Sequence, residues 1–322
     1  MISVHLESGR VTVRRQPLPR VPLAFARIRL LAAGICSTDL ELQRGYYGFS
    51  GTPGHEFVGE VVAVADGEGA KWIGSRVAGE INLACGHCEW CARGLGRHCP
   101  TRTVLGIVKH PGAFREFLTL PIRNLHRVPD SISTEQAVFI EPVAAACEIL
   151  DQVKIPPGDG VAVLGDGKLG LLIAQVLAAH GARVHLVGRH RGKMRLVEKH
   201  GVTTELVPQK LPQRAFRWVV DATGSAEGLR AAVTMCEPRG TVIMKSTVHG
   251  LVGFDTAPAI VNEVTLVGSR CGRFGPALRL LASKRIEVND LMSAEFPLDR
   301  APQAFALAAT KGVLKVLLRP PG

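Results

Sequence analysis

Four of the chain's eight cysteines lie within the fifteen residues CGHCEWCARGLGRHC, at positions 85–99. Their spacing is C-x2-C-x2-C-x7-C, with the ligand positions Cys85, Cys88, Cys91 and Cys99. The short gaps allow neighbouring thiolates to converge on one ion, and the longer gap allows the chain to fold back. Four thiolates that leave no open position describe a closed tetrahedral zinc site, which is structural rather than catalytic. The spacing therefore predicts a structural zinc site, called the zinc staple below, and places the catalytic chemistry elsewhere in the chain.

Two other uses of these cysteines fit the sequence less well. Pro100 after Cys99 suggests an iron–sulfur cluster, but the bacterial cluster motif has a much shorter last gap than the seven residues found here. Disulfide frameworks are typical of secreted proteins, and the N-terminus MISVHLESGRVTVRR does not have the pattern of a secretory signal. His87 and His98 are interpreted as bystanders of the cysteine site.

A second set of metal-binding side chains is spread along the first half of the chain. Cys36 stands in GICSTDLE, His55 and Glu56 in GTPGHEFVG, and Glu141 in FIEPVAAA. Alone, each residue type is ordinary. Together they offer a thiolate, an imidazole and one or two carboxylates. Three protein ligands and one open position are what a catalytic zinc requires.

The order and spacing of these segments resemble the zinc-dependent medium-chain alcohol dehydrogenase family over almost the whole chain. The resemblance rests on G-I-C-S-T-D at 34–39, G-H-E at 54–56, the four-cysteine loop, E-P at 141–142 and G-D-G-K-L-G at 165–170. It implies an α/β fold, in which a GroES-like β-rich catalytic domain is joined to a Rossmann domain with a doubly wound parallel sheet. It also implies an active site in the cleft between the two domains.

The resemblance assigns ligand roles to the second set. Cys36 and His55 match the family's catalytic zinc ligands, and Glu141 matches the third ligand position. A carboxylate there resembles the polyol, sugar and threonine dehydrogenase branches. Glu56 matches a residue that ligates zinc in some members and exchanges with the third ligand or with water in others. Which glutamate binds the resting zinc is left open.

The segment that follows Cys36 contains three residues that match the family's proton-transfer machinery. Thr38 matches the hydroxyl that hands on the substrate proton, and Asp39 matches an acid that orients the zinc-bound histidine. Glu41 stands where several members have the histidine that ends the proton relay. Glu41 is therefore either a relay group or a surface residue of a helix.

A nucleotide site is indicated by VAVLGDGKLGLLIAQVL, in which an apolar strand, a glycine turn and a helix follow one another. Gly165, Gly167 and Gly170 would allow a tight turn and close approach of a pyrophosphate to the helix N-terminus. Backbone N–H groups near Lys168 and Leu169 would face it.

The choice between the two nicotinamide cofactors is read from the end of the next strand, ARVHLVGRHR. An NAD site usually carries an acid there, but this chain has Gly188, Arg189 and His190. A small residue leaves room for a 2′-phosphate and Arg189 can pair with it, which favours NADP(H) over NAD(H). Lys193 matches a family lysine near the adenosine ribose, and Thr223 in DATGS is a further expected contact.

These residues need two kinds of element to position them. Runs such as ARIRLLAAG and VGEVVAVAD (58–66) predict strands of an antiparallel or mixed sheet, and 134–150 predicts a helix capped by Ser133, with Gln136 completing a capping box. Alternating strands and helices then predict a parallel sheet. We therefore expect a catalytic domain over 1–148 plus 286–322, and a Rossmann domain over 149–285.

Composition limits the partners. The formal net charge of +11 is scattered and no nucleic-acid motif accompanies it, so no nucleic-acid partner is predicted. No apolar run is long enough for a membrane span, and a cytoplasmic location is the default. We expect a small alcohol or carbonyl substrate and, from the resemblance, a homodimer or homotetramer, with strand residues near 264–268 extending the Rossmann sheet across the dimer axis. A zinc-free NADPH-dependent quinone or enone reductase and a non-catalytic NADPH-binding protein remain as alternatives.

Overall fold

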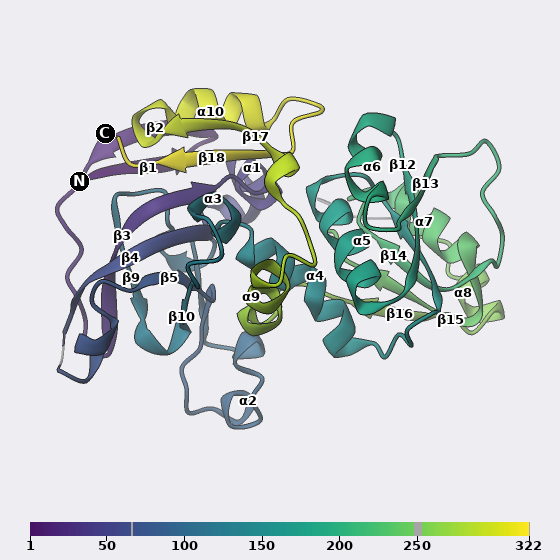
Figure 1. Ribbon diagram of the computed structural model, residues 1–322, viewed down its shortest axis with the longest axis horizontal. Helices are drawn as coiled ribbons and strands as arrows, with labels where there is room; N and C mark the ends of the chain where they lie inside the picture. The colour runs from purple at the N-terminus through teal and green to yellow at the C-terminus, as the bar shows by residue number, and fades with distance from the viewer. Residues whose placement is uncertain (66, 248–252, 322) are drawn as a thin grey trace. The chain divides into compact units, whose positions relative to one another are not determined.

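The computed structural model describes residues 1–65, 67–247 and 253–321 (Figure 1). Asp66, the last residue of one predicted strand, and Gly322 lie outside the described residues. The chain forms two compact units, Met1–Glu141 with Leu291–Gly322, and Pro142–Asp290. Among the described helices, none combines the length and apolar content that a membrane span requires.

The first unit is built around a mixed sheet of seven strands, in the order β10-β5-β4-β3-β18-β17, with β9 also paired to β3. Its strands are β3 (Phe25–Gly34), β4 (Glu56–Val64), β5 (Arg76–Gly79), β9 (Phe117–Pro121), β10 (Leu125–Arg127), β17 (Met292–Pro297) and β18 (Lys315–Arg319). Small sheets are formed by β1 (Ile2–Glu7) with β2 (Arg10–Arg15), and by β6 (Asn82–Leu83), β7 (Thr103–Leu105) and β8 (Lys109–His110). The helices are α1 (Ser37–Gln43), α2 (Glu89–Ala92), α3 (Thr134–Ala137) and α10 (Ala301–Ala308), with α4 (Ile140–Gln152) starting at its edge.

Strand β3 organises this unit because it pairs with three neighbours. Along β3, Ala26, Ile28 and Leu30 are fully or almost fully buried, as the period of a strand requires. Antiparallel pairing of Gly34 with Glu56 places the end of β3 beside the start of β4. Pairing of Gly34 with Leu317 also places β18 there, so in Figure 1 the C-terminal strand lies in the same sheet as the purple N-terminal strand β3. Three distant segments thus converge at one point.

The second unit is a parallel sheet of six strands in the order β13-β12-β11-β14-β15-β16. The strands are β11 (Gly160–Leu164), β12 (Arg183–Gly188), β13 (Thr203–Leu206), β14 (Phe216–Asp221), β15 (Cys236–Met244) and β16 (Thr265–Gly268). The helices are α5 (Lys168–His180), α6 (Arg191–Glu198), α7 (Ala226–Met235), α8 (Ala257–Val261) and α9 (Phe274–Ala282). Because β11 lies between β12 and β14, the order reverses at its carboxyl end, which is where such sheets bind ligands.

Short 3-10 turns complete the chain at η1 (Tyr46–Gly48), η2 (Glu68–Trp72), η3 (Gly96–His98), η4 (Ile122–Asn124), η5 (Asn289–Leu291) and η6 (Leu298–Arg300).

The predicted helix over 134–150 is two helices, so its continuity was wrong. The capping box is confirmed, with the Gln136 N–H donating to Ser133 Oγ at 3.2 Å and the Ser133 N–H donating to Gln136 Oε1 at 3.0 Å. The N–H of Phe139 then bonds to the carbonyl of Gln136, three residues back, which tightens and ends α3. Helix α4 restarts at Ile140 and tolerates Pro142 in its first turn. It runs unbroken through 148 and 149, where a domain boundary is predicted.

Candidate metal centres and nucleotide site

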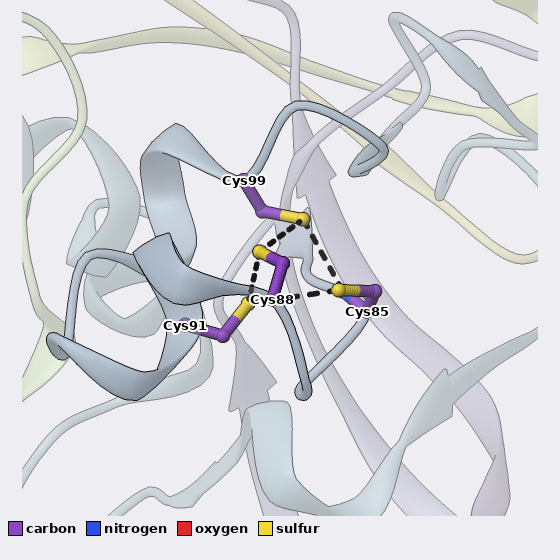
Figure 2. A group of neighbouring side chains, drawn as sticks. All are labelled: Cys85, Cys88, Cys91 and Cys99. Atoms are coloured by element: carbon purple, nitrogen blue, oxygen red, sulfur yellow. Dashed lines mark hydrogen bonds between the residues drawn. The ribbon is translucent and has the colours of Figure 1, made fainter.

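The four loop cysteines converge on one point of the first unit. Figure 2 shows their sulfurs facing one another, and all four lie within 4.8 Å of one another. The Sγ–Sγ distances are 3.9 Å for Cys85 to Cys91, 3.5 Å for Cys88 to Cys91, and 3.8 Å for Cys88 to Cys99. Sulfurs at ~2.3 Å from a tetrahedral zinc lie about 3.8 Å apart. The group therefore has the dimensions of a closed zinc–thiolate site.

Backbone N–H groups favour the thiolate form at two of the four cysteines, Cys85 and Cys99. The N–H of His87 lowers the pKa of Cys85 to about 5, and the N–H of Cys85, whose nitrogen is 3.5 Å from the sulfur, lowers the pKa of Cys99. Thiolates, rather than thiols, are the metal ligands. Neither His87 nor His98 belongs to the converging group.

A second group forms where β3 ends and β4 begins. Cys36, His55 and Glu56 each offer a ligand atom within 4.8 Å of the others. Cys36 is the N-cap residue of α1, two positions after β3, and His55 directly precedes β4. His55 and Glu56 are buried. The antiparallel register described above is what brings these separate segments together.

Asp39 organises this group from inside. It is fully buried, its Oδ2 accepts from the Cys36 N–H at 2.8 Å, and its Oδ1 accepts from the Gly54 N–H at 3.1 Å. The same Oδ1 lies 3.6 Å from His55 Nδ1. Although burial lowers it, the pKa of His55 is raised well above 6.5 by the charges of Asp39 and Cys36. Asp39 thus holds both the thiol and the imidazole segments.

The donor set of this group fits a divalent ion. A thiol, an imidazole and a carboxylate that converge in a buried place are a recognised catalytic zinc combination, and an ion there would offset the cost of burying them.

The remaining predicted residues of this site lie nearby on helices. Thr38 Oγ1 is 3.8 Å from Cys36 Sγ. Glu41 pairs with Arg44 at 2.6 Å on the outer part of α1. Glu141 lies in the first turn of α4, half-buried, and is not part of the converging group. The carboxylate that the structure brings to Cys36 and His55 is that of Glu56.

Lys315 is a member of this neighbourhood that the sequence motifs did not indicate. Its side chain comes from β18 and is fully buried, and its Nζ donates a hydrogen bond to Glu56 Oε2. Although burial lowers it, the pKa of Lys315 is raised by the charges of Glu56 and Cys36. A lysine inside the apolar run VLKVLL was the available signal.

The second unit contains a cavity of about 450 Å³ at the carboxyl ends of β11, β12 and β14. Predicted cofactor residues line it: Gly165, Gly167, Gly188, Arg189, His190 and Thr223. Four other predicted residues are not among its lining residues: Lys168, Leu169, Gly170 and Lys193. The lining also includes Asp166, Val207, Leu211, Ser225 and Glu227, which the sequence reasoning missed.

The glycine turn is shaped for close approach of a ligand. Gly165 has φ +109°, and a Cβ on Gly170 would lie 1.9 Å from the carbonyl oxygen of Gly165. A Cβ on Gly167, the N-cap of α5, would meet nothing within 4 Å. Two glycines therefore pack the turn, while the third leaves open space at a helix N-terminus, which fits a pyrophosphate.

Asp166 is a residue of the glycine turn, and its carboxylate contacts the backbone at the end of β12. Its Oδ2 accepts from the N–H groups of Arg189 at 2.9 Å and His190 at 2.5 Å. The same oxygen is 3.0 Å from His190 Nδ1. An acid is therefore present at the end of β12 after all, supplied by a neighbouring loop.

Known proteins share both halves of this arrangement. The family described as "Alcohol dehydrogenase GroES-like domain" matches residues 25–130, and the family described as "Zinc-binding dehydrogenase" matches residues 169–283. The D-altritol 5-dehydrogenase of Agrobacterium fabrum is 30% identical over 277 residues, which are 82% of this chain and 82% of that protein.

The chain belongs to the zinc-type alcohol and polyol dehydrogenase family. Among solved structures, the alcohol dehydrogenase TADH of Thermus sp. ATN1 is 31% identical with a TM-score of 0.88 and 100% of both chains covered. A protein described as a zinc-binding dehydrogenase of Sinorhizobium meliloti 1021, bound to NADP, is 28% identical with a TM-score of 0.87 and 99% of both chains covered. The predicted fold class of this dehydrogenase, GroES-like plus Rossmann, is confirmed.

Proposed function

We propose that this dehydrogenase interconverts a secondary alcohol or polyol and its carbonyl compound, using zinc and NADP(H). The observation that carries the proposal is the convergence of Cys36, His55 and Glu56 on one buried point. The nucleotide cavity of the second unit supports the hydride-transfer half of the reaction. In the forward direction the alcohol loses a proton from oxygen and a hydride from carbon.

The chain's own residues would prepare the alcohol oxygen. A zinc ion held there would supply a Lewis acid that acidifies an alcohol and polarises a carbonyl. Cys36 and His55 would hold the ion, with Glu141 as the third ligand and Glu56 able to exchange with it. Thr38 would accept the proton of the alcohol as its own hydroxyl proton passes on to solvent, and the same transfers would run backwards in the reverse reaction. Asp39 would keep His55 oriented through the 3.6 Å contact at Nδ1.

NADP(H) is the proposed cofactor because of the residues at the end of β12. Gly188 offers no side chain there, and Arg189 and His190 line the cavity beside it. A guanidinium pairs well with a 2′-phosphate. The Sinorhizobium relative bound to NADP supports the same choice.

The proposed substrate class is a polyol or secondary alcohol. The carboxylate at Glu141 supports this class through the resemblance to polyol dehydrogenases, and the D-altritol 5-dehydrogenase relative supports it independently. We place the enzyme in the cytosol, because zinc–thiolate sites need reduced cysteines.

A homodimer or homotetramer is proposed from the edge of the parallel sheet. Strand β16 is the last strand of that sheet, with Leu266 38% exposed. On α8, Ile260 and Val261 are 70% and 76% exposed. A second copy pairing along β16 would extend the sheet and cover these apolar side chains. Light scattering on Leu266→Lys should then show a smaller particle than the wild type.

The deciding experiment is the zinc content per chain of the wild type and of Cys36→Ser, with NADPH and NADH titrations of each. We expect about two zinc ions to fall to about one, with NADPH binding retained. Cys147→Ala is the control, because Cys147 is buried in the second unit and belongs to neither of the two proposed zinc sites. About one zinc in both proteins would eliminate the zinc mechanism and favour a zinc-free reductase or a cofactor-binding protein.

A further inference from the structure

We propose that Asp166 sets the cofactor choice of this enzyme, by supplying from the glycine turn the acid that the end of β12 lacks. The inference rests on the proposed nicotinamide cofactor. It implies that the adenine-ribose end of the cavity combines two opposite features, the Arg189 guanidinium, which attracts a 2′-phosphate, and a carboxylate, which favours a 2′-hydroxyl. The chain would therefore bind NAD(H) as well as NADP(H), with only a modest preference.

The position of Asp166 is determined by its hydrogen bonds. The side chain of Asp166 is 11% exposed, and its Oδ2 accepts from two consecutive backbone N–H groups, those of Arg189 and His190. These N–H groups directly follow β12, so the carboxylate is fixed at the strand end.

Asp166 fills the space that a side chain at position 188 would need. A Cβ on Gly188 would lie 2.6 Å from Asp166 Cβ and 2.8 Å from Asp166 Cγ. A side chain at position 188 would therefore collide with Asp166, and also with Met194, whose Sδ would lie 2.7 Å from the same Cβ. The glycine that suggested an absent acid instead leaves room for an acid that arrives from the adjacent loop.

The charges around this point oppose one another. Arg189 and His190 line the same cavity as Asp166, and His190 Nδ1 is engaged by Asp166 at 3.0 Å. A phosphate added to the ribose would gain the guanidinium but would also be brought toward a fixed carboxylate. A free hydroxyl, in contrast, can donate to the carboxylate at no electrostatic cost. Asp166 should thus weaken NADP(H) binding and strengthen NAD(H) binding.

The test compares Asp166→Asn with the wild type, because asparagine keeps the shape and one acceptor oxygen but removes the charge. Dissociation constants are measured for NADPH and NADH, and for 2′,5′-ADP and 5′-ADP, which isolate the adenosine end of the site. We expect the NADPH/NADH affinity ratio and the fragment ratio both to rise by about tenfold or more. Asp159→Asn is the control, since Asp159 accepts from Trp218 Nε1 at 2.9 Å before β11 begins, at the opposite end of that strand.

A second variant moves the acid back to the strand. Asp166→Gly combined with Gly188→Asp removes the clash with Asp166, and only the flexible side chain of Met194 must then shift. The double variant should favour NADH and 5′-ADP relative to Asp166→Gly alone. Gly188→Asp alone should be less stable than the double variant, because two acids would share one space.

Two results would overturn the inference: a shift toward NADH in Asp166→Asn, or unchanged ratios, whether or not both cofactors bind more weakly. Failure of the proposed nicotinamide cofactor, on which the inference rests, is distinguishable, because the wild type would then bind neither cofactor nor either fragment. Wild-type binding with an unchanged ratio in Asp166→Asn removes the inference alone.

Discussion

The Nζ of Lys315 donates a hydrogen bond to Glu56 Oε2, and each of these side chains is only 1% exposed. The two residues are 259 positions apart, yet β18 and β4 both flank the end of β3. Gly34 makes the pair possible, because a Cβ there would lie 2.7 Å from Glu56 Oε2. The C-terminal strand is thereby tied electrostatically to the proposed catalytic zinc site.

Replacing Lys315 should destabilise the first unit. Lys315→Met leaves the carboxylate of Glu56 buried without its partner, which costs about 3–5 kcal/mol in comparable buried pairs. Chemical denaturation measures the loss. Lys199→Met is the control, because Lys199 pairs with Glu287 and Asp290 on the surface and its loss should cost under about 1 kcal/mol.

The double variant Glu56→Gln with Lys315→Met completes a mutant cycle. It should be more stable than Lys315→Met alone, since no buried charge remains without a partner. Additive losses from the two single changes would show that the buried pair has no coupling energy and would contradict this account.

Removing one staple cysteine should remove one zinc ion without touching the other site. Cys91→Ser is expected to lower the zinc content by about one ion per chain and to destabilise the loop around Trp90, because structural zinc contributes directly to folding. Metal analysis reports the first effect, and a change in intrinsic tryptophan fluorescence reports the second. Cys236→Ala, at a buried cysteine of β15, should leave the zinc content unchanged. Unchanged zinc in Cys91→Ser would remove the staple interpretation.

Features encoded by close spacing could be predicted from the sequence. The cysteine loop, the capping box of Ser133 and Gln136, and the turn at Gly165 and Gly170 each depend on residues a few positions apart. Local geometry then follows from residue type, as with the positive φ at Gly165. The parallel sheet was equally accessible, because its buried strands are continuous apolar runs.

Features that depend on strand register could not be predicted. Lys315 reaches Glu56 only because β18 joins β3, and nothing local to VLKVLL specifies that partner. Asp166 was missed for a related reason: it belongs to the glycine turn in sequence, but its carboxylate binds the backbone at the end of β12. The expected role of Glu141 as a ligand stays a prediction.

Acid should weaken the contact between α3 and β18. The pKa of Glu135 is lowered by its own backbone N–H and, against the opposing effect of burial, by Arg319 and Ser133. A lowered folded-state pKa gives stability that is present above the usual pKa of 4.5 and is lost as the pH falls through the folded-state pKa.

Glu135→Gln should therefore be less stable than the wild type at pH 7, by under about 1 kcal/mol, because the pair of Glu135 and Arg319 is about a third exposed. Denaturation at a series of pH values should show this difference shrinking below pH 4.5, and a difference that stays constant or grows there would contradict the assignment.

Alanine at two glycines of the nucleotide turn should affect different properties, stability at Gly170 and cofactor binding at Gly167. Gly170→Ala places a methyl group against the carbonyl oxygen of Gly165, so we expect a loss of about 1–3 kcal/mol in stability from overpacking. Gly167→Ala meets open space, and Gly167 has φ −72°, which alanine adopts freely, so the stability should change by less than about 1 kcal/mol.

The methyl group of Gly167→Ala would instead fill the space left for a pyrophosphate at the start of α5, and the dissociation constant for NADPH should rise by about tenfold or more. Thermal denaturation and NADPH titration of both variants separate packing from binding, and a Gly167→Ala protein with wild-type NADPH affinity would show that the cofactor does not use this turn.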